Sequence, residues 1–183
     1  MNYFRLSVLT TVLFFACGLQ SMNRYRGSDI FNSIKRYVFP ITIDQVQAMS
    51  SEEKNIELSC QAFVAFKRWE SDNIKPARES LDNIITFVRC GASADSHIYV
   101  RNKSIEKMFT PLYLALVSNS IIHAQELLEH GAQPDVVWSV STIAKTDRQF
   151  YFSALQVADR WCDDSGEMRR LIFLYEKKKR GLL

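Results

Sequence analysis

The segment from Phe109 to Asp135, FTPLYLALVSNSIIHAQELLEHGAQPD, contains the signals that decide the fold of this chain. Thr110 belongs to the residue types that cap helix N-termini, and Pro111 suits the first helical position because proline loses no hydrogen bond there. Asn119 tolerates the positive φ of a turn, and Gly131 suits the left-handed position after a helix end. The second half has an apolar stripe with helical spacing, at Ile121, Ala124, Leu127 and Leu128. The segment therefore predicts two helices joined by a tight turn.

The closing part of this segment occurs twice. Gly91-Ala92 precedes Gly131-Ala132 by 40 residues, and an aspartate follows each pair at the same distance. A weaker unit starts at Ser153-Ala154-Leu155-Gln156-Val157-Ala158. The apolar face of its second helix is given by Met168, Leu171, Ile172 and Tyr175. Internal similarity at such a period is typical of repeat proteins.

A further pair of helices is predicted before the first Gly-Ala pair. Ser50 and Glu53 have the spacing of a capping box, and an amphipathic pattern follows over residues 52–70. Pro76 would open a second helix over 77–90. We interpret these two helices as a divergent first repeat, so the repeat region is expected to span residues 52–183. Residues 19–51 are expected to be an N-terminal extension that covers the end of the stack.

These motifs resemble the ankyrin repeat. Thr110 to Ala115 resembles the T-P-L-H-x-A opening of that family, and Glu126 to Asp135 resembles its closing stretch. Tyr113 stands where the family has histidine, and the spacing of 40 exceeds the usual value of about 33. The resemblance implies an all-α fold, a short ankyrin-type α-solenoid of about three helix-turn-helix repeats. The extra residues would lengthen the finger loops between repeats.

The first 18 residues have the pattern of a secretion signal. Arg5 precedes an uncharged, mostly apolar run from Leu6 to Ala16, which is too short to span a bilayer. Cys17 between two small residues resembles the lipidated cysteine of a bacterial lipoprotein, although Phe15 departs from that pattern. We therefore expect an exported protein, either secreted or anchored in the cell envelope. A chain retained in the membrane as a structural protein is the alternative.

Composition and motifs predict no catalytic centre. The net charge of +3, from 23 basic and 20 acidic residues, does not favour nucleic-acid binding. His123 and His130 are about 10 Å apart along one predicted helix and are expected to be exposed, which argues against a metal site. No cofactor motif occurs. A thiol-dependent enzyme using Cys90 is the remaining enzymatic alternative, and no base neighbours this residue in the sequence.

We therefore expect a module that binds another protein without catalysis. In the ankyrin family the fingers and the concave helix surface contact ligands, and by resemblance the long fingers, near 96–108 and 136–150, would do so here. The aromatic and arginine side chains that dominate interface energetics are the candidate anchors. They are Tyr99, Arg101, Trp138 and Arg148. For Trp138, packing against the edge of the stack is an equal alternative.

The C-terminal segment carries the basic character of the chain. Residues 167–183 have a net charge of +4, and Lys177 to Arg180 form one basic cluster. Such a cluster at a helix end is usually solvated and also interacts favourably with the helix dipole. Attraction to an anionic lipid surface is the second interpretation. Membrane association could therefore come from a lipid on Cys17 or from this tail.

Overall fold

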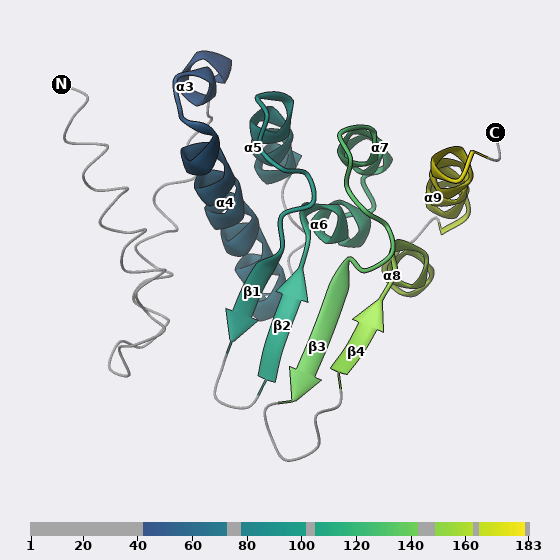
Figure 1. The fold of residues 1–183 in the computed structure, drawn as a ribbon. Coiled ribbons are helices and arrows are strands. Elements are labelled where there is room, and N and C mark those ends of the chain that lie inside the picture. Colours follow the sequence, from purple (N-terminus) through teal and green to yellow (C-terminus); the bar gives the residue numbers. More distant parts are fainter. Residues whose placement is uncertain (1–41, 73–77, 102–104, 143–148, 163–164, 182–183) are drawn as a thin grey trace. The chain divides into compact units, whose positions relative to one another are not determined.

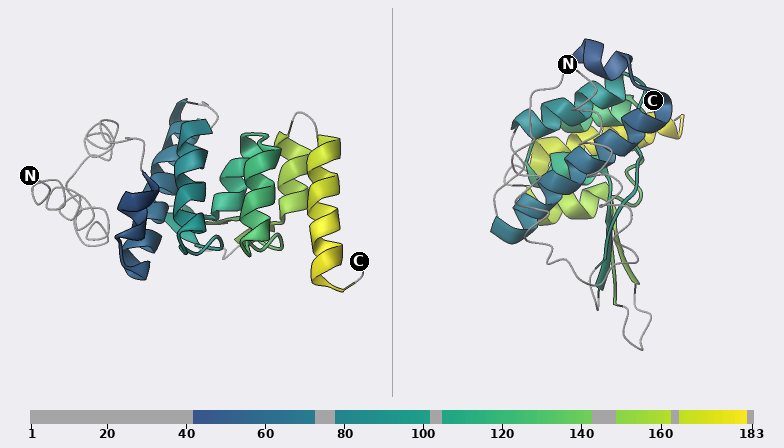
Figure 2. Two further views of the ribbon diagram at one scale, coloured as in Figure 1. Left: turned by 90° about the horizontal axis from the view of Figure 1, so that it is seen from above. Right: turned by 90° about the vertical axis from the view of Figure 1, so that its left-hand side faces the viewer.

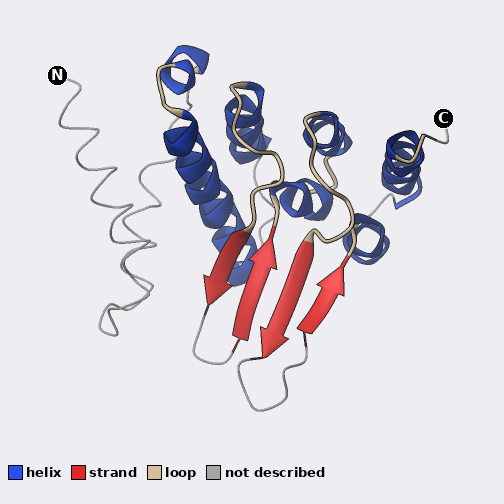
Figure 3. Ribbon diagram, viewed as in Figure 1, coloured by secondary structure: helices blue, strands red, loops and turns tan. Residues whose placement is uncertain are grey.

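Pairs of helices alternate with pairs of strands along the chain (Figures 1 and 3). The computed structural model describes residues 42–72, 78–101, 105–142, 149–162 and 165–181, which belong to one unit, Phe39–Leu183. The helices are α3 (Ile43–Gln47), α4 (Ser51–Asp72), α5 (Arg78–Arg89), α6 (Pro111–Val117), α7 (Ile121–Glu129), α8 (Ala154–Trp161) and α9 (Ser165–Lys179). The strands are β1 (Ile98–Arg101), β2 (Ile105–Phe109), β3 (Trp138–Thr142) and β4 (Gln149–Phe152).

The helices stack as three successive pairs. Helix α4 packs on α5, α6 on α7, and α8 on α9. Between pairs, α6 contacts both α4 and α8, and α7 contacts both α5 and α9. The pairs follow one another in chain order along one direction, as the left view of Figure 2 shows. Helix α3 packs on α5 through the fully buried Val46.

The predicted helix ends are confirmed. Gly91 and Gly131 both have φ +95°, and Asn119 has φ +53°. At the end of α7, the backbone N–H groups of Gly131 and Ala132 donate to the carbonyls of Leu128 and Leu127, respectively. These bonds satisfy carbonyls that have no partner within the helix. The same two bonds recur after α5, so both helices end in the same cap. Ser50 and Glu53 form the expected capping box, with bonds of 2.7 and 3.2 Å.

The predicted all-α fold class is wrong, because the two fingers are β-hairpins. Strands β1 and β2 pair antiparallel, as do β3 and β4, and β2 also pairs with β3. The result is a four-stranded antiparallel sheet in the order β1-β2-β3-β4, so the fold is mixed α and β. Pairing of β2 with β3 joins residues from different fingers, which local patterns do not reveal. The right view of Figure 2 shows this sheet edge-on, extending away from the helices.

The core runs through all three helix pairs. Leu112 and Ala115 of α6, and Leu127 and Leu128 of α7, have no exposed surface. Ile122 lies on the opposite side of α7 and is 68% exposed. Burial of the stripe on α7 therefore follows the helical spacing that the sequence predicted.

Because Leu128 is fully buried, Leu128→Ala should leave a cavity and lower the free energy of unfolding by about 2–5 kcal/mol. Ile122→Ala is the matched control on the same helix and should change it by less than about 0.5 kcal/mol. Urea denaturation of both variants measures the difference. Similar losses at the two positions would mean that α7 does not present this face to the core.

Candidate functional site

The register of the strands defines two faces of the sheet. Ile98, Phe109, Trp138 and Phe152 are paired across the four strands and form one row. Side chains alternate along a strand, so the row two residues further on points to the same face. That second row contains Val100, Lys107, Val140 and Phe150. This face meets the helices, because Phe66 of α4 stacks on Phe109 with ring centroids 4.3 Å apart.

Aromatic side chains fill the corner between this face and helices α4, α6 and α8. The ring of Tyr113 stacks on Trp138 at 5.4 Å, and Trp138 stacks on Phe152 at 4.9 Å. Trp161 meets Trp138 edge-on at 5.3 Å, and Trp69 meets Tyr113 in the same way at 5.6 Å. We call these five residues the aromatic seam. Tyr113 is fully buried, whereas the other four are half-buried.

The seam continues into an uncovered apolar surface on the second hairpin. Val140 is half-buried, and Phe150 is 53% exposed. On the first hairpin, α4 contacts β1, and Val100 in the same row is only 8% exposed. The two hairpins therefore differ in what lies over the same face. We call Val140, Phe150, Phe152 and Trp161 the hairpin face.

A cluster of charged side chains joins α4 to the sheet beside the seam. Glu70 of α4 accepts hydrogen bonds from Lys67, at 2.6 Å, and from Lys107 of β2. Partial burial acts to raise the pKa of Glu70, but the hydrogen bonds and charges of the two lysines outweigh it, so the pKa lies below its ordinary value. Glu70 is therefore held as a carboxylate, and one surplus positive charge remains in the cluster.

Three buried polar groups in or beside the seam have no hydrogen-bond partner within the described residues. They are the Tyr113 hydroxyl, the Trp138 indole Nε1 and the Thr110 hydroxyl. Thr110 occupies the N-cap position of α6 but its side chain makes no capping bond. Burial, followed by the nearby charge of Glu70, raises the pKa of Tyr113. Among the described residues, nothing compensates the burial of the Tyr113 hydroxyl with a hydrogen bond.

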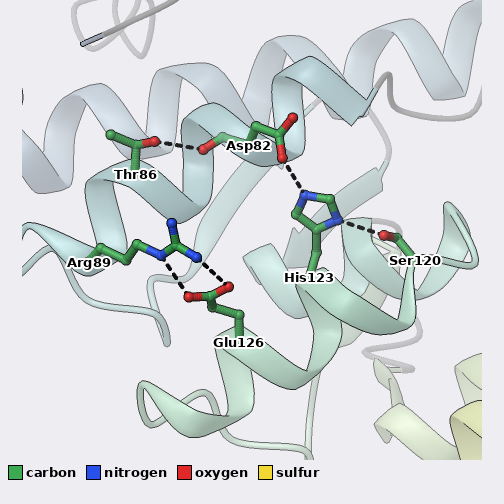
Figure 4. A network of polar contacts seen from close by, with 6 residues as sticks. All are labelled: Asp82, Thr86, Arg89, Ser120, His123 and Glu126. Carbon is green, nitrogen blue, oxygen red and sulfur yellow. Dashed lines mark hydrogen bonds and ion pairs between the residues drawn. The ribbon is translucent and has the colours of Figure 1, made fainter. Parts of the chain in front are cut away.

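A second polar network links α5 to α7 (Figure 4). His123, which was predicted to be exposed, is only 5% exposed. Its Nε2 lies 2.9 Å from Asp82 Oδ1 and its Nδ1 lies 2.6 Å from Ser120 Oγ. Since a carboxylate only accepts, Nε2–H donates to Asp82, and in the neutral ring Nδ1 accepts from the Ser120 hydroxyl. Sequence reasoning missed this role because Asp82 is 41 residues away.

The Ser120, His123 and Asp82 contacts have the composition of a catalytic triad but a different environment. In a serine hydrolase the aspartate is buried, whereas the Asp82 side chain is 59% exposed here. Ser120 is the N-cap of α7, three residues before His123 in the same turn. Nearby, Arg89 binds Glu126 through two hydrogen bonds of 2.6 and 2.8 Å. These bonds join consecutive helix pairs, so we interpret the network as a structural connection.

Of the four residues predicted as binding anchors, the structure describes three, and it places Tyr99 and Arg101 on β1 and Trp138 on β3. Tyr99 on β1 is 63% exposed and lies on the opposite face of the sheet from the seam. Arg101 is the last residue of β1, paired with Glu106. Trp138 lies in the seam, in agreement with the packing role that the sequence left open. Arg148 lies outside the described residues, as does Cys17.

The hairpin face was missed by sequence reasoning. Phe150 and Phe152 alternate with Gln149 and Tyr151, which is the period of a strand. That four-residue signal could have identified β4. The partner strand β3 carries the same signal, because Ser139 and Ser141 alternate with Trp138 and Val140.

The remaining candidate chemistry is dispersed. Cys60, Cys90 and Cys162 are all half-buried, and the Cys162 thiol donates to the carbonyl of Leu116 at 3.1 Å. In the part of the chain that the structure describes, His, Cys, Asp and Glu form no group of three or more suited to a metal ion. Among the same residues, no helix combines the length and apolar character needed to cross a bilayer.

Comparisons with known proteins give no relative. No family model, no curated protein and no solved structure matches this chain.

The unpartnered Tyr113 hydroxyl gives a stability prediction. Tyr113→Phe removes a buried hydroxyl that lacks a partner, so the free energy of unfolding should stay the same or rise by about 1 kcal/mol. Tyr151→Phe is the control, since Tyr151 is 55% exposed, and it should have no effect. Denaturation curves of both variants test this. A loss of more than about 1 kcal/mol in Tyr113→Phe would mean that the hydroxyl is bonded, for example to an ordered water.

The Glu70 cluster gives a pH prediction. A carboxyl whose folded-state pKa lies below its ordinary value of 4.5 stabilises the protein above that pH, and the contribution is lost as the pH falls through the folded-state pKa. Glu70→Gln should therefore lower the melting temperature at neutral pH, and the gap to the unmodified protein should close on acidification. Glu106→Gln, on the other face of β2, is the control. A gap that is constant with pH would exclude an ionic role for Glu70.

Proposed function

We propose that this protein is an exported, non-catalytic module that binds another protein through the hairpin face. The observation that supports the proposal is the uncovered row of apolar side chains on β3 and β4. Phe150 is 53% exposed there, whereas the equivalent face of the first hairpin is covered by α4. Contiguous apolar surface beside a packed core is typical of interaction sites.

The hairpin face has the properties of a preorganised site. Strand β3 is paired on both sides, and Trp138 is fixed by rings from α6, α8 and β4. Binding to such a surface costs little conformational entropy. Trp161 lies at its edge with the Arg160 guanidinium carbon 5.1 Å from the centre of its ring. Tryptophan and arginine are frequent hot-spot residues in protein interfaces.

The relationship to ankyrin repeats is part of the same proposal. It is supported by the residues from Thr110 to Ala115 and by the two matching Gly-Ala helix ends. Export is supported by the sequence pattern of residues 1–18 alone. Mass spectrometry of the mature N-terminus would distinguish cleavage from lipidation of Cys17 and from retention of the whole segment.

The binding proposal predicts a selective loss of partner capture. In the double variant Val140→Thr and Phe150→Thr, polar β-branched residues replace apolar ones and preserve strand propensity. The melting temperature should stay within a few degrees, while cross-linked partners recovered from the producing cells or their host should decrease about tenfold or more, since hot-spot losses exceed 1.4 kcal/mol.

Tyr151→Thr is the matched control for this experiment. It makes the same kind of change on the same strand, at a residue that is 55% exposed on the opposite face. It should retain every partner. If the control loses the partner and the double variant keeps it, the binding surface is the other face of the sheet.

A further inference from the structure

Helix α9 presents an outer face that combines apolar and basic side chains. Arg170, Phe173, Leu174 and Lys177 follow the i, i+3, i+4, i+7 spacing that places residues on one side of a helix. Phe173 is 50% exposed and Leu174 is 43% exposed. The residues that turn inward from α9, Met168 and Ile172, are fully buried. The helix is therefore apolar on two sides, although only one of them meets the core.

The basic residues of α9 fall into two groups. Arg169 pairs with Asp159 at 3.1 Å, and Lys179 binds the Gln133 side chain and lies 3.8 Å from Asp135. No ion pair within the described residues neutralises the second group. That group consists of Arg170, Lys177 and Lys178 of α9, together with Arg180, which directly follows the helix.

The cations of the second group lie directly beside the exposed apolar residues. The Lys177 ammonium is 4.7 Å from the centre of the Phe173 ring. Leu174 and Lys178 also line an open groove of about 450 Å³ between α7 and α9. The other groove residues are Gln125, Leu128, Glu129, Leu171 and Tyr175. Apolar surface and positive charge thus occur side by side at Phe173 and Lys177 and at Leu174 and Lys178, and Glu129 is the one acidic residue among the described residues that line the groove.

We propose that the outer face of α9 docks on the surface of an anionic phospholipid bilayer. A helix that lies in the membrane interface inserts Phe and Leu among the acyl chains while flanking Lys and Arg reach the phosphates. Protein interfaces, in contrast, are depleted in lysine relative to the rest of the surface. The charge of this face and its apolar pair therefore fit a lipid surface better than a protein. The site is separate from the hairpin face and does not depend on the function proposed above.

The test uses the full chain and phosphatidylcholine vesicles with and without phosphatidylglycerol. The unmodified protein should float with the anionic vesicles more than with the neutral ones, and salt should reduce the difference. Lys177→Gln should weaken binding to the anionic vesicles about fivefold, because one lysine or arginine near such a surface usually contributes about 1 kcal/mol. Lys179→Gln is the control with the same change of charge, and should weaken binding less than twofold because Lys179 is engaged with Gln133 and Asp135.

The double variant Phe173→Ser and Leu174→Ser tests the apolar component. It should retain its melting temperature, since both side chains are largely exposed, and lose about tenfold or more in binding to the anionic vesicles. All variants contain residues 1–18, so any contribution of that segment is common to them. Equal losses for Lys177→Gln and Lys179→Gln, unchanged binding of the double variant, or equal binding to neutral vesicles would each overturn the proposal.

Discussion

The pairing of β2 with β3 is the constraint on which the rest of the structure depends. Strand β2 runs directly into α6 at Thr110, and β3 follows the helix end at Gly131 after a short connection. Hydrogen bonds between the strands therefore fix the spacing of successive helix pairs, in addition to helix packing. The backbone N–H of Thr110 donates to the carbonyl of Val137 at 3.0 Å, and the N–H of Val137 donates to the carbonyl of Phe152 at 2.9 Å. These bonds extend the hydrogen bonding of the sheet to the residues that precede α6 and α8. Without this pairing the fingers would be separate hairpins, which are marginally stable in water.

The aromatic seam follows from that constraint. Once the sheet is continuous, its first row faces three helices, and large flat side chains fill the corner. As a result, polar atoms of Tyr113 and Trp138 are buried without a hydrogen-bond partner among the described residues. The lengths of the helices then determine which part of this sheet face remains exposed. Helix α4 extends over the first hairpin, whereas α8 ends at Trp161, immediately above the second. The hairpin face is exposed because no described helix covers it, and this geometric difference distinguishes two otherwise similar hairpins.

Local signals made the helices predictable. The caps at Gly91 and Gly131, the capping box at Ser50, and the stripe on α7 each depend on residues within a few positions of one another. The sheet could not be predicted in the same way, because β2 and β3 belong to different fingers and no local pattern specifies their pairing. His123 shows the same limit at the level of one residue. Its spacing on the helix suggested exposure, but a carboxylate from the preceding repeat gives it a buried, bonded position.

The two surfaces proposed for binding differ in chemistry because one lies on paired strands and the other on a single helix. The hairpin face belongs to β3, which is paired on both sides, and to the edge strand β4, which is paired with β3, so its apolar side chains lie on a regular backbone and suit a partner of defined shape. The outer face of α9 is one side of a single helix with lysines in its last turn, and such a surface suits a fluid layer of phosphates without fixed geometry. Packing in the core does not account for Phe173 and Leu174, which are 50% and 43% exposed, whereas contact with such a layer would bury both side chains.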